Sequence, residues 1–179
     1  MALKATIFKA DLQISDMDRN YYGSHSLTLA RHPSETDERM MVRLLAFAIY
    51  ASEALAFTKG ISTDDEPDLW QKSLSDEIEL WIEMGQPDER RIRKACARAK
   101  QVVLISFGGR SPEIWWRQIQ DKLTRFENLR VINIPAESCA ELSALATRSM
   151  QLQCSIQDGQ IWLSANDTAV EITPNLWMM

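Results

Sequence analysis

Two carboxylates, Asp68 and Glu79, have the residue types and spacing of a site for a hard divalent cation. Asp68 follows Pro67, and Glu79 comes eleven residues later within the run EIELWIE. Mg²⁺ takes oxygen ligands, and one or two carboxylates completed by waters and phosphate are enough to bind it. Such an ion polarises a phosphodiester and lowers the pKa of its bound water. The pair therefore predicts a Mg²⁺ or Mn²⁺ site. The alternative is a pair of solvated acids beside an edge strand.

A third carboxylate, Glu53, falls on a predicted helix in the same row as Ala46 and Ile49. This flank is less polar than a freely solvated carboxylate would favour. A glutamate that faces a sheet from such a helix could join a metal or water network. It could equally form an ion pair with an arginine near the edge of the core, and the residue types alone leave both readings open.

A basic segment follows the predicted strand that contains Glu79. Its charged members are Arg90, Arg91, Arg93, Lys94, Arg98 and Lys100. Arg91, Lys94 and Arg98 are three or four residues apart, so they share one flank of a helix predicted over 88–99. This flank could bind phosphate groups, or it could be an ordinary solvated surface.

The elements that must position these residues follow from hydrophobic periodicity. EIELWIE alternates, so it predicts a strand over 77–83 with Glu79 and Trp81 on one face, beside residues 68–73. A helix is predicted from Ser34 to about Phe57. After the strand, the predicted order is helix 88–99, strand 101–107, helix 112–124, strand 129–135 and helix 136–149. Alternation of strands and helices indicates a mixed sheet flanked by helices, which is an α/β fold.

Hairpins are predicted at both ends of the chain. Residues 4–15 and 24–30 alternate on either side of a polar segment, and 152–164 alternate around Asp158-Gly159. A further strand is predicted at AVEIT. One domain over 1–179 is expected from the length.

The composition and charge of the chain exclude some classes of protein. The net charge is −5, which argues against a protein that coats nucleic acid by charge alone. No apolar run is long enough to span a membrane, and the N-terminus lacks a signal-peptide pattern. Three widely separated cysteines predict reduced thiols in a cytoplasmic protein. The oligomeric state stays open, with a monomer favoured.

Several long segments together resemble the YaeQ family of bacterial proteins. They are RHPSETDERMMVRLLAFAIYA, DDEPDLW, IELWIEMGQPDERRIRKAC and SIQDGQIWLS. The resemblance covers nearly the whole chain. That family has a fold similar to the PD-(D/E)XK nuclease superfamily, which includes restriction endonucleases. The resemblance therefore implies a restriction-endonuclease-like core and a metal-dependent phosphodiesterase site.

The superfamily motif maps onto this chain residue by residue. Pro67-Asp68 matches its PD, Glu79 its second carboxylate, and Glu53 a helical acid that some members use. Trp81 stands where the motif has lysine. Some members recruit that lysine from the next helix, and Lys94 is then the substitute. The superfamily's strand between the first helix and the PD segment is not evident here.

The resemblance assigns Asp68 and Glu79 to the metal and adds Glu53 and Lys94 as catalytic residues. Trp81, on the same strand face as Glu79, is expected to border the carboxylates. Trp81, Arg91 and Arg98 are expected to bind the nucleic-acid substrate. Lys94 is expected to point its ammonium toward the two carboxylates.

Three functions agree with this pattern. The first is a magnesium-dependent nuclease. The second is a nucleic-acid or nucleotide binder that kept the fold and lost the chemistry. The third is an interaction protein with an exposed aromatic surface, for which Trp115-Trp116 is a candidate.

Overall fold

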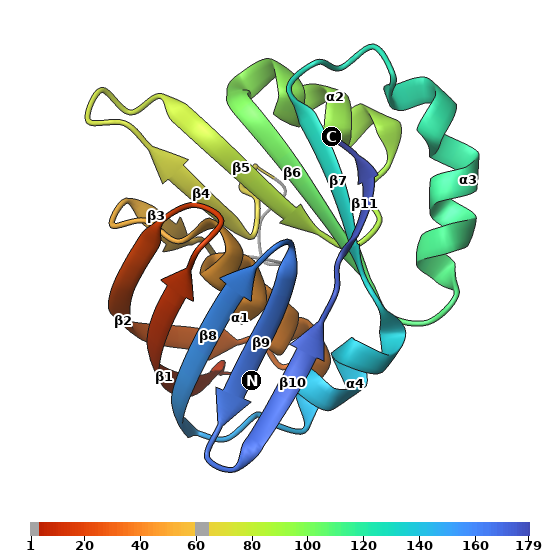
Figure 1. Cartoon of the computed structure of the whole chain (residues 1–179). Coiled ribbons are helices and arrows are strands. Elements are labelled where there is room, and N and C mark those ends of the chain that lie inside the picture. The colour runs from red at the N-terminus through yellow and green to blue at the C-terminus, as the bar shows by residue number, and fades with distance from the viewer. Residues whose placement is uncertain (1–3, 60–64) are drawn as a thin grey trace. The chain divides into compact units, whose positions relative to one another are not determined.

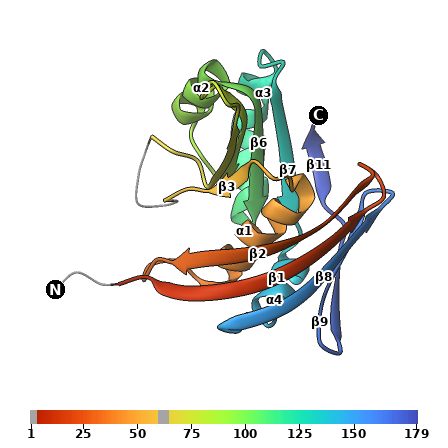
Figure 2. The same cartoon turned by 90° about the vertical axis from the view of Figure 1, so that its left-hand side faces the viewer.

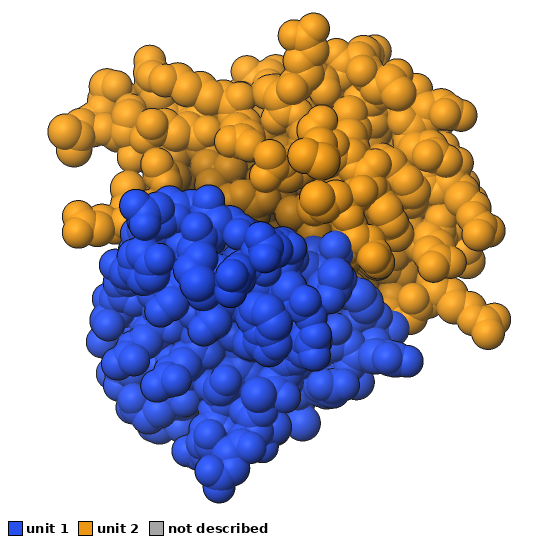
Figure 3. Space-filling model, viewed as in Figure 1, with its two compact units in different colours: residues 1–49, 135–174 blue, residues 50–134, 175–179 orange. Residues whose placement is uncertain are grey.

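The computed structural model describes residues 4–59 and 65–179. The described residues form four helices and two mixed β-sheets, so the predicted α/β class is confirmed. The chain divides into two compact units, coloured separately in Figure 3. Unit 1 comprises residues 1–49 and 135–174, and unit 2 comprises residues 50–134 and 175–179.

Unit 1 is built on a five-stranded sheet with the order β10-β9-β8-β1-β2 (Figure 1). The strands are β1 (Thr6–Asp16), β2 (Tyr21–Arg31), β8 (Ser149–Gln157), β9 (Gln160–Ala165) and β10 (Thr168–Ile172). Strands β1 and β8 run parallel, and the other neighbours run antiparallel. The two predicted terminal hairpins therefore exist, and the β1–β8 pairing joins them into one sheet.

One face of this sheet is buried and the other is exposed. In β1 the buried side chains are Phe8, Ala10, Leu12 and Ile14, which alternate with exposed polar residues. Helix α1 (Asp37–Tyr50) lies along one face of the sheet (Figure 2), and α4 (Ala136–Ser143) contacts β10. This alternation is the ordinary pattern for an antiparallel sheet with one solvated face.

Unit 2 contains a six-stranded sheet with the order β11-β7-β6-β5-β4-β3. Its strands are β3 (Leu55–Phe57), β4 (Leu69–Lys72), β5 (Ile78–Met84), β6 (Ala99–Phe107), β7 (Leu129–Ile134) and β11 (Asn175–Met178). Strands β5, β6 and β7 are parallel, whereas β3, β4 and β11 are antiparallel to their neighbours. The predicted strand over 77–83 does lie beside residues 68–73.

Helices α2 (Glu89–Arg98) and α3 (Ser111–Leu123) connect the parallel strands of unit 2. Both helices pack on the sheet face that carries Trp81. The buried members of this core are Trp81, Ile92, Ala95, Ala99, Val102, Leu104, Ile119, Leu123, Leu129 and Val131. The face of β5 that carries Glu79, Trp81 and Glu83 is therefore the face on which α2 packs.

The predicted helix 34–57 is too long. Helix α1 ends at Tyr50, and Leu55–Phe57 forms β3, the strand that was not evident in the sequence. Ser52 Oγ accepts a hydrogen bond from the Leu55 backbone N–H and donates one to Gln71 on β4. A serine hydroxyl that bonds locally in this way offers the backbone an alternative to helix. The predicted helix 136–149 is likewise shorter, because Ser149 begins β8.

Candidate functional site

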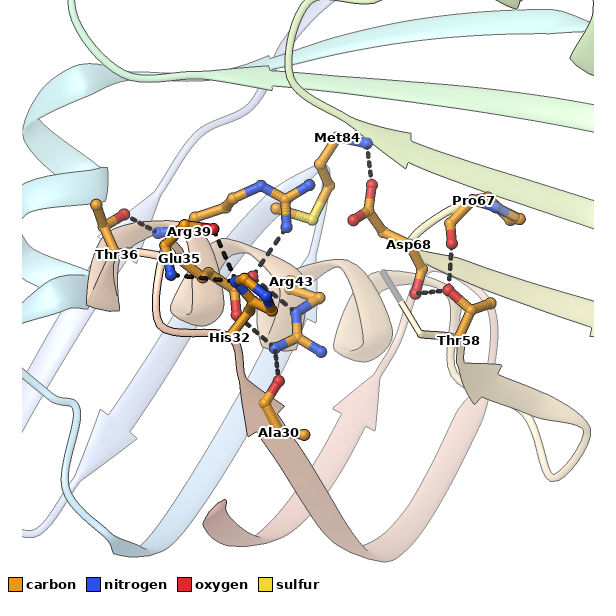
Figure 4. A network of polar contacts seen from close by, with 11 residues as sticks. Ala30, His32, Glu35, Thr36, Arg39, Arg43, Thr58, Pro67, Asp68 and Met84 are labelled. Carbon is orange, nitrogen blue, oxygen red and sulfur yellow. Dashed lines mark hydrogen bonds and ion pairs between the residues drawn. The ribbon is translucent and has the colours of Figure 1, made fainter. Parts of the chain in front are cut away.

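Asp68 is held firmly at the start of β4. Its side chain is buried, and its Oδ2 accepts a hydrogen bond of 2.8 Å from the Met84 backbone N–H (Figure 4). The Asp68 backbone N–H donates to the Ile82 carbonyl at 3.0 Å. Both bonds tie Asp68 to the last residues of β5, so its carboxylate has a fixed position in the sheet.

The pairing register decides which carboxylate lies beside Asp68. Leu69 pairs with Ile82 in the antiparallel β4–β5 ladder, so the preceding residue, Asp68, lies next to Glu83. Glu79 is four residues farther along β5, which is roughly 13 Å at about 3.3 Å per residue. The structure therefore brings Asp68 together with Glu83, and it does not bring Asp68 together with Glu79.

Glu83 is a buried carboxylate with two different partners. Its Oε1 accepts a hydrogen bond of 3.1 Å from the Trp81 indole N–H. Its Oε2 forms an ion pair with the Arg91 guanidinium. Burial raises the pKa of Glu83, and the negative charge of Asp68 raises it further, while Arg91 and Trp81 act in the opposite direction. Desolvation penalises the charged form of a carboxyl group. Arg91 offsets this penalty only in part, so ionised Glu83 would gain from a further positive charge.

Arg91 reaches Glu83 from the first turn of α2. Asp88 is the N-cap of this helix, and its Oδ1 accepts a 2.8 Å hydrogen bond from the Arg91 backbone N–H. The Arg91 side chain also donates from Nη2 to the Glu66 carbonyl at 3.1 Å. The helix start thus places one permanent positive charge at the buried carboxylate pair.

Trp81 lies between this carboxylate pair and the core of unit 2. Its side chain is buried, and its ring makes an edge contact with Trp70 at a centroid distance of 6.4 Å. The Arg98 guanidinium lies 5.2 Å from the Trp81 ring centroid, a cation–π distance. Through its indole N–H, Trp81 borders Glu83, which shares its face of β5.

Lys94 does not contact the carboxylate pair. Its side chain is 57% exposed, and its Nζ lies 3.3 Å from Asp65 Oδ1. Arg98 donates from Nη1 to the Asp65 carbonyl at 2.9 Å, so both residues contact the acidic loop before β4. The positively charged side chain at Glu83 is Arg91, whereas Lys94, which was expected to point toward the carboxylates, pairs with Asp65.

Glu53 is exposed in the turn between α1 and β3. The sequence placed it on the helix with a sheet-facing flank, but α1 ends three residues before it. Without the helix, the row that relates Glu53 to Ala46 and Ile49 does not extend to position 53. The structure therefore does not bring it into the network around Glu83.

Glu83 is the residue that sequence reasoning missed, although the sequence carried a usable signal. Strands β4 and β5 form a hairpin around 73–77, in which the Ser73 backbone N–H bonds to the Glu77 carbonyl. Residues at equal distances from the turn lie opposite each other in such a ladder. Counting outward from Ser75 pairs Asp68 with the region of Glu83, whereas Glu79 pairs near Lys72.

The candidate site offers a small number of carboxylate oxygens as possible ligands for a metal ion. Among residues 4–59 and 65–179, no group of three or more His, Cys, Asp or Glu side chains is arranged to hold a metal ion. Asp68 and Glu83 are a pair, and Mg²⁺ is commonly held by one or two carboxylates with waters and substrate phosphate completing its coordination. The pair and the charge deficit at Glu83 therefore fit a hard divalent cation.

In the part of the chain that the structure describes, no helix is long and apolar enough to cross a membrane.

Comparison with known proteins gives one consistent match over nearly the whole chain. The family model described as YaeQ protein matches residues 1–174. The uncharacterized protein YaeQ of Escherichia coli (strain K12) is 52% identical over 177 residues, covering 99% of this chain and 98% of that protein. The corresponding protein of Salmonella typhi is 51% identical over the same length, with the same coverage.

Two solved structures are similar to this fold. The crystal structure of the YaeQ protein from Xanthomonas axonopodis pv. citri superposes with a TM-score of 0.95 at 50% identity, covering 97% of this chain and 98% of the other. That of the YaeQ protein from Pseudomonas syringae gives a TM-score of 0.93 at 34% identity, with coverages of 98% and 97%.

Proposed function

Because the chain belongs to the YaeQ protein family, we propose for it a function that rests on the site itself: a phosphodiesterase that uses Mg²⁺ or Mn²⁺ and acts on nucleic acid. The observation that carries this proposal is the buried pair Asp68 and Glu83, with Arg91 at its edge. Two acids that share a buried position repel each other, and a divalent cation between them removes that cost.

In this function, Asp68 and Glu83 are the residues that hold the cation. When bound, the cation would polarise a phosphodiester and supply a water of lowered pKa. The hydrogen bond from the Met84 N–H fixes Asp68, and the Trp81 indole fixes one oxygen of Glu83. Arg91 cannot lose its proton near neutral pH, so it would offset negative charge on phosphate and would not act as a base.

The remaining basic residues of α2 fit a surface that contacts phosphate. Arg93 and Arg98 are exposed, and the exposed Lys94 ammonium lies beside the carboxylate of Asp65. If two or three phosphates are neutralised there, the logarithm of the binding constant falls with the logarithm of salt concentration with a slope of about −2 to −3. The net charge of −5 keeps the overall affinity modest.

Titration calorimetry with MnCl₂ tests the cation site. Wild type should bind Mn²⁺ weakly, and Asp68→Asn and Glu83→Gln should each reduce the affinity by about tenfold or more. Glu79→Gln is the matched control, because it removes a carboxylate from the same face of β5 without touching the pair. A loss in Glu79→Gln with none in Glu83→Gln would place the cation elsewhere.

Cleavage is tested separately, with plasmid DNA and single-stranded RNA in Mg²⁺ and in Mn²⁺. The proposal expects products from wild type that are absent for Asp68→Asn and Glu83→Gln, purified in parallel.

A binding module on the same fold is the second candidate, and one observation favours it. Lys94 points to Asp65 and not to the carboxylates, so the lysine that orients a nucleophilic water in related sites has no equivalent on α2 at this pair. Fluorescence anisotropy of labelled DNA and RNA separates the candidates. Binding by wild type that depends on Arg91 and Lys94, with no cleavage under any cation, would select the binding module.

A further inference from the structure

Both side-chain oxygens of Glu83 have a partner within the protein. Oε1 accepts from the Trp81 indole N–H, and Oε2 is paired with the Arg91 guanidinium. A cation that uses Glu83 as a ligand must therefore displace at least one of these partners, and the two differ in how readily they can leave.

Trp81 is enclosed by the core of unit 2, whereas the Arg91 side chain is partly exposed. The Trp81 side chain is 2% exposed and belongs to the packed core of unit 2. The Arg91 side chain is 30% exposed. Besides Glu83 it contacts the Glu66 carbonyl in the loop before β4, and the N-cap Asp88 holds its backbone. A guanidinium on a flexible stem can turn away from the carboxylate without disturbing α2, and it carries donors matched to phosphate oxygens.

We propose that Arg91 is an exchangeable counter-ion of Glu83, a role that rests on the proposed function. Its guanidinium forms an ion pair with Glu83. When a divalent cation takes Glu83 Oε2, the like charges of cation and guanidinium repel, and Arg91 is released to bind a phosphate oxygen of the substrate. The released Arg91 would therefore bind a phosphodiester anion.

The proposed exchange of Arg91 and a merely positioning role of Arg91 predict different effects on cation affinity. If Arg91 competes with the cation, removing Arg91 strengthens cation binding. If Arg91 only holds Glu83 in position, removing it leaves the affinity unchanged or weakens it. The sign of the change in affinity therefore distinguishes the two roles.

The experiment is MnCl₂ calorimetry at pH 8 on wild type, Arg91→Ala, Arg91→Lys and the control Arg93→Ala. Arg93 is exposed on the same helix and has no hydrogen bond or ion pair among the described residues. We expect Arg91→Ala to bind Mn²⁺ on the order of fivefold more tightly, a typical size for coupled binding. Arg91→Lys should return the affinity toward wild type, and Arg93→Ala should equal wild type.

Unchanged or weaker binding in Arg91→Ala would overturn the exchange while leaving the cation site intact. Wild-type Mn²⁺ binding that survives in both Asp68→Asn and Glu83→Gln would instead overturn the proposed function. A second measurement does not depend on the variant's stability. The NMR signal of the Arg91 side-chain Nε–H should move when diamagnetic Mg²⁺ is added to wild type, and the assignment is checked by its loss in Arg91→Lys. An unmoved signal at saturating Mg²⁺ would contradict the exchange.

Discussion

Each unit of the molecule buries a glutamate against arginine, but the two are paired differently. In unit 1, Glu35 accepts from two arginines. Arg43 donates from Nη2 to Oε1 at 2.8 Å and from Nε to Oε2 at 3.2 Å, and Arg39 donates from Nη1 to Oε2 at 2.9 Å (Figure 4). In unit 2, Glu83 has one arginine, one neutral indole and a neighbouring carboxylate, Asp68.

The difference separates a structural carboxylate from a carboxylate that can accept a ligand. The charge of Glu35 is matched by a bidentate arginine and a second arginine, which makes the group part of the framework. Burial raises the pKa of Glu83, and the single arginine beside it offsets this effect only in part. A buried acid with too little positive charge around it is a place where a cation lowers the free energy most.

The largest expected effect is on stability at neutral pH. Glu35→Gln removes the buried carboxylate to which Arg43 and Arg39 both donate, and it should lower the free energy of unfolding by about 3–5 kcal/mol. Glu83→Gln removes a carboxylate that is costly to ionise, and the partner that it leaves, Arg91, is partly exposed to solvent, so this change should cost less than about 1 kcal/mol. Urea denaturation of both variants measures the contrast, and equal losses would break the comparison.

The next effect is stabilisation by cation. At tenfold the dissociation constant, Mn²⁺ should raise the free energy of unfolding of the native protein by about 1.4 kcal/mol, seen as a rise in Tm of a few degrees. Glu79→Gln should keep this rise, and Glu83→Gln should lose it. A rise of the same size in Glu83→Gln would show that the cation binds elsewhere.

A smaller effect concerns pH. Because the pKa of Glu83 is raised in the folded protein, its contribution to stability is present below its ordinary pKa of 4.5 and is lost as pH rises through the raised value. Glu83→Gln should therefore gain stability relative to wild type between pH 4 and pH 8. The same titration should weaken Mn²⁺ binding as pH falls, since proton and cation compete for Glu83. Thermal melts measure the relative stability across this pH range, and calorimetry measures the Mn²⁺ affinity. Wild type becoming more stable than Glu83→Gln as the pH rises would contradict the prediction.

The smallest effect is expected at the exposed ion pair of α2. Lys94→Ala removes a partner of Asp65 that is more than half exposed, and such pairs contribute about 0.5 kcal/mol or less. Mn²⁺ affinity should not change, because Lys94 does not touch the carboxylate pair. A tenfold loss of Mn²⁺ affinity in Lys94→Ala would show that Lys94 contributes to the cation site.

Much of the fold could be predicted because it depends on local pattern. The alternation of EIELWIE gave β5, and the buried run QVVLISF gave the centre of β6. Asp158 and Gly159 both have positive φ values, 54° and 77°, as a tight hairpin turn requires, so that turn was predictable from its residue types. The end of α1 was not, because the pairing of Leu55–Phe57 with β4 competes with helix.

The sequence by itself determined most of the strands, most helices and the face of β5 that carries its acids. A period of two gives Glu79 and Glu83 the same face, so periodicity cannot choose between them. Only the tertiary structure decided that Asp68 meets Glu83, because the β4–β5 register depends on the turn and on a bulge between Gln71 and Lys72. It also decided that Lys9 lies beside Ser149, a parallel pairing between distant segments that no local pattern encodes.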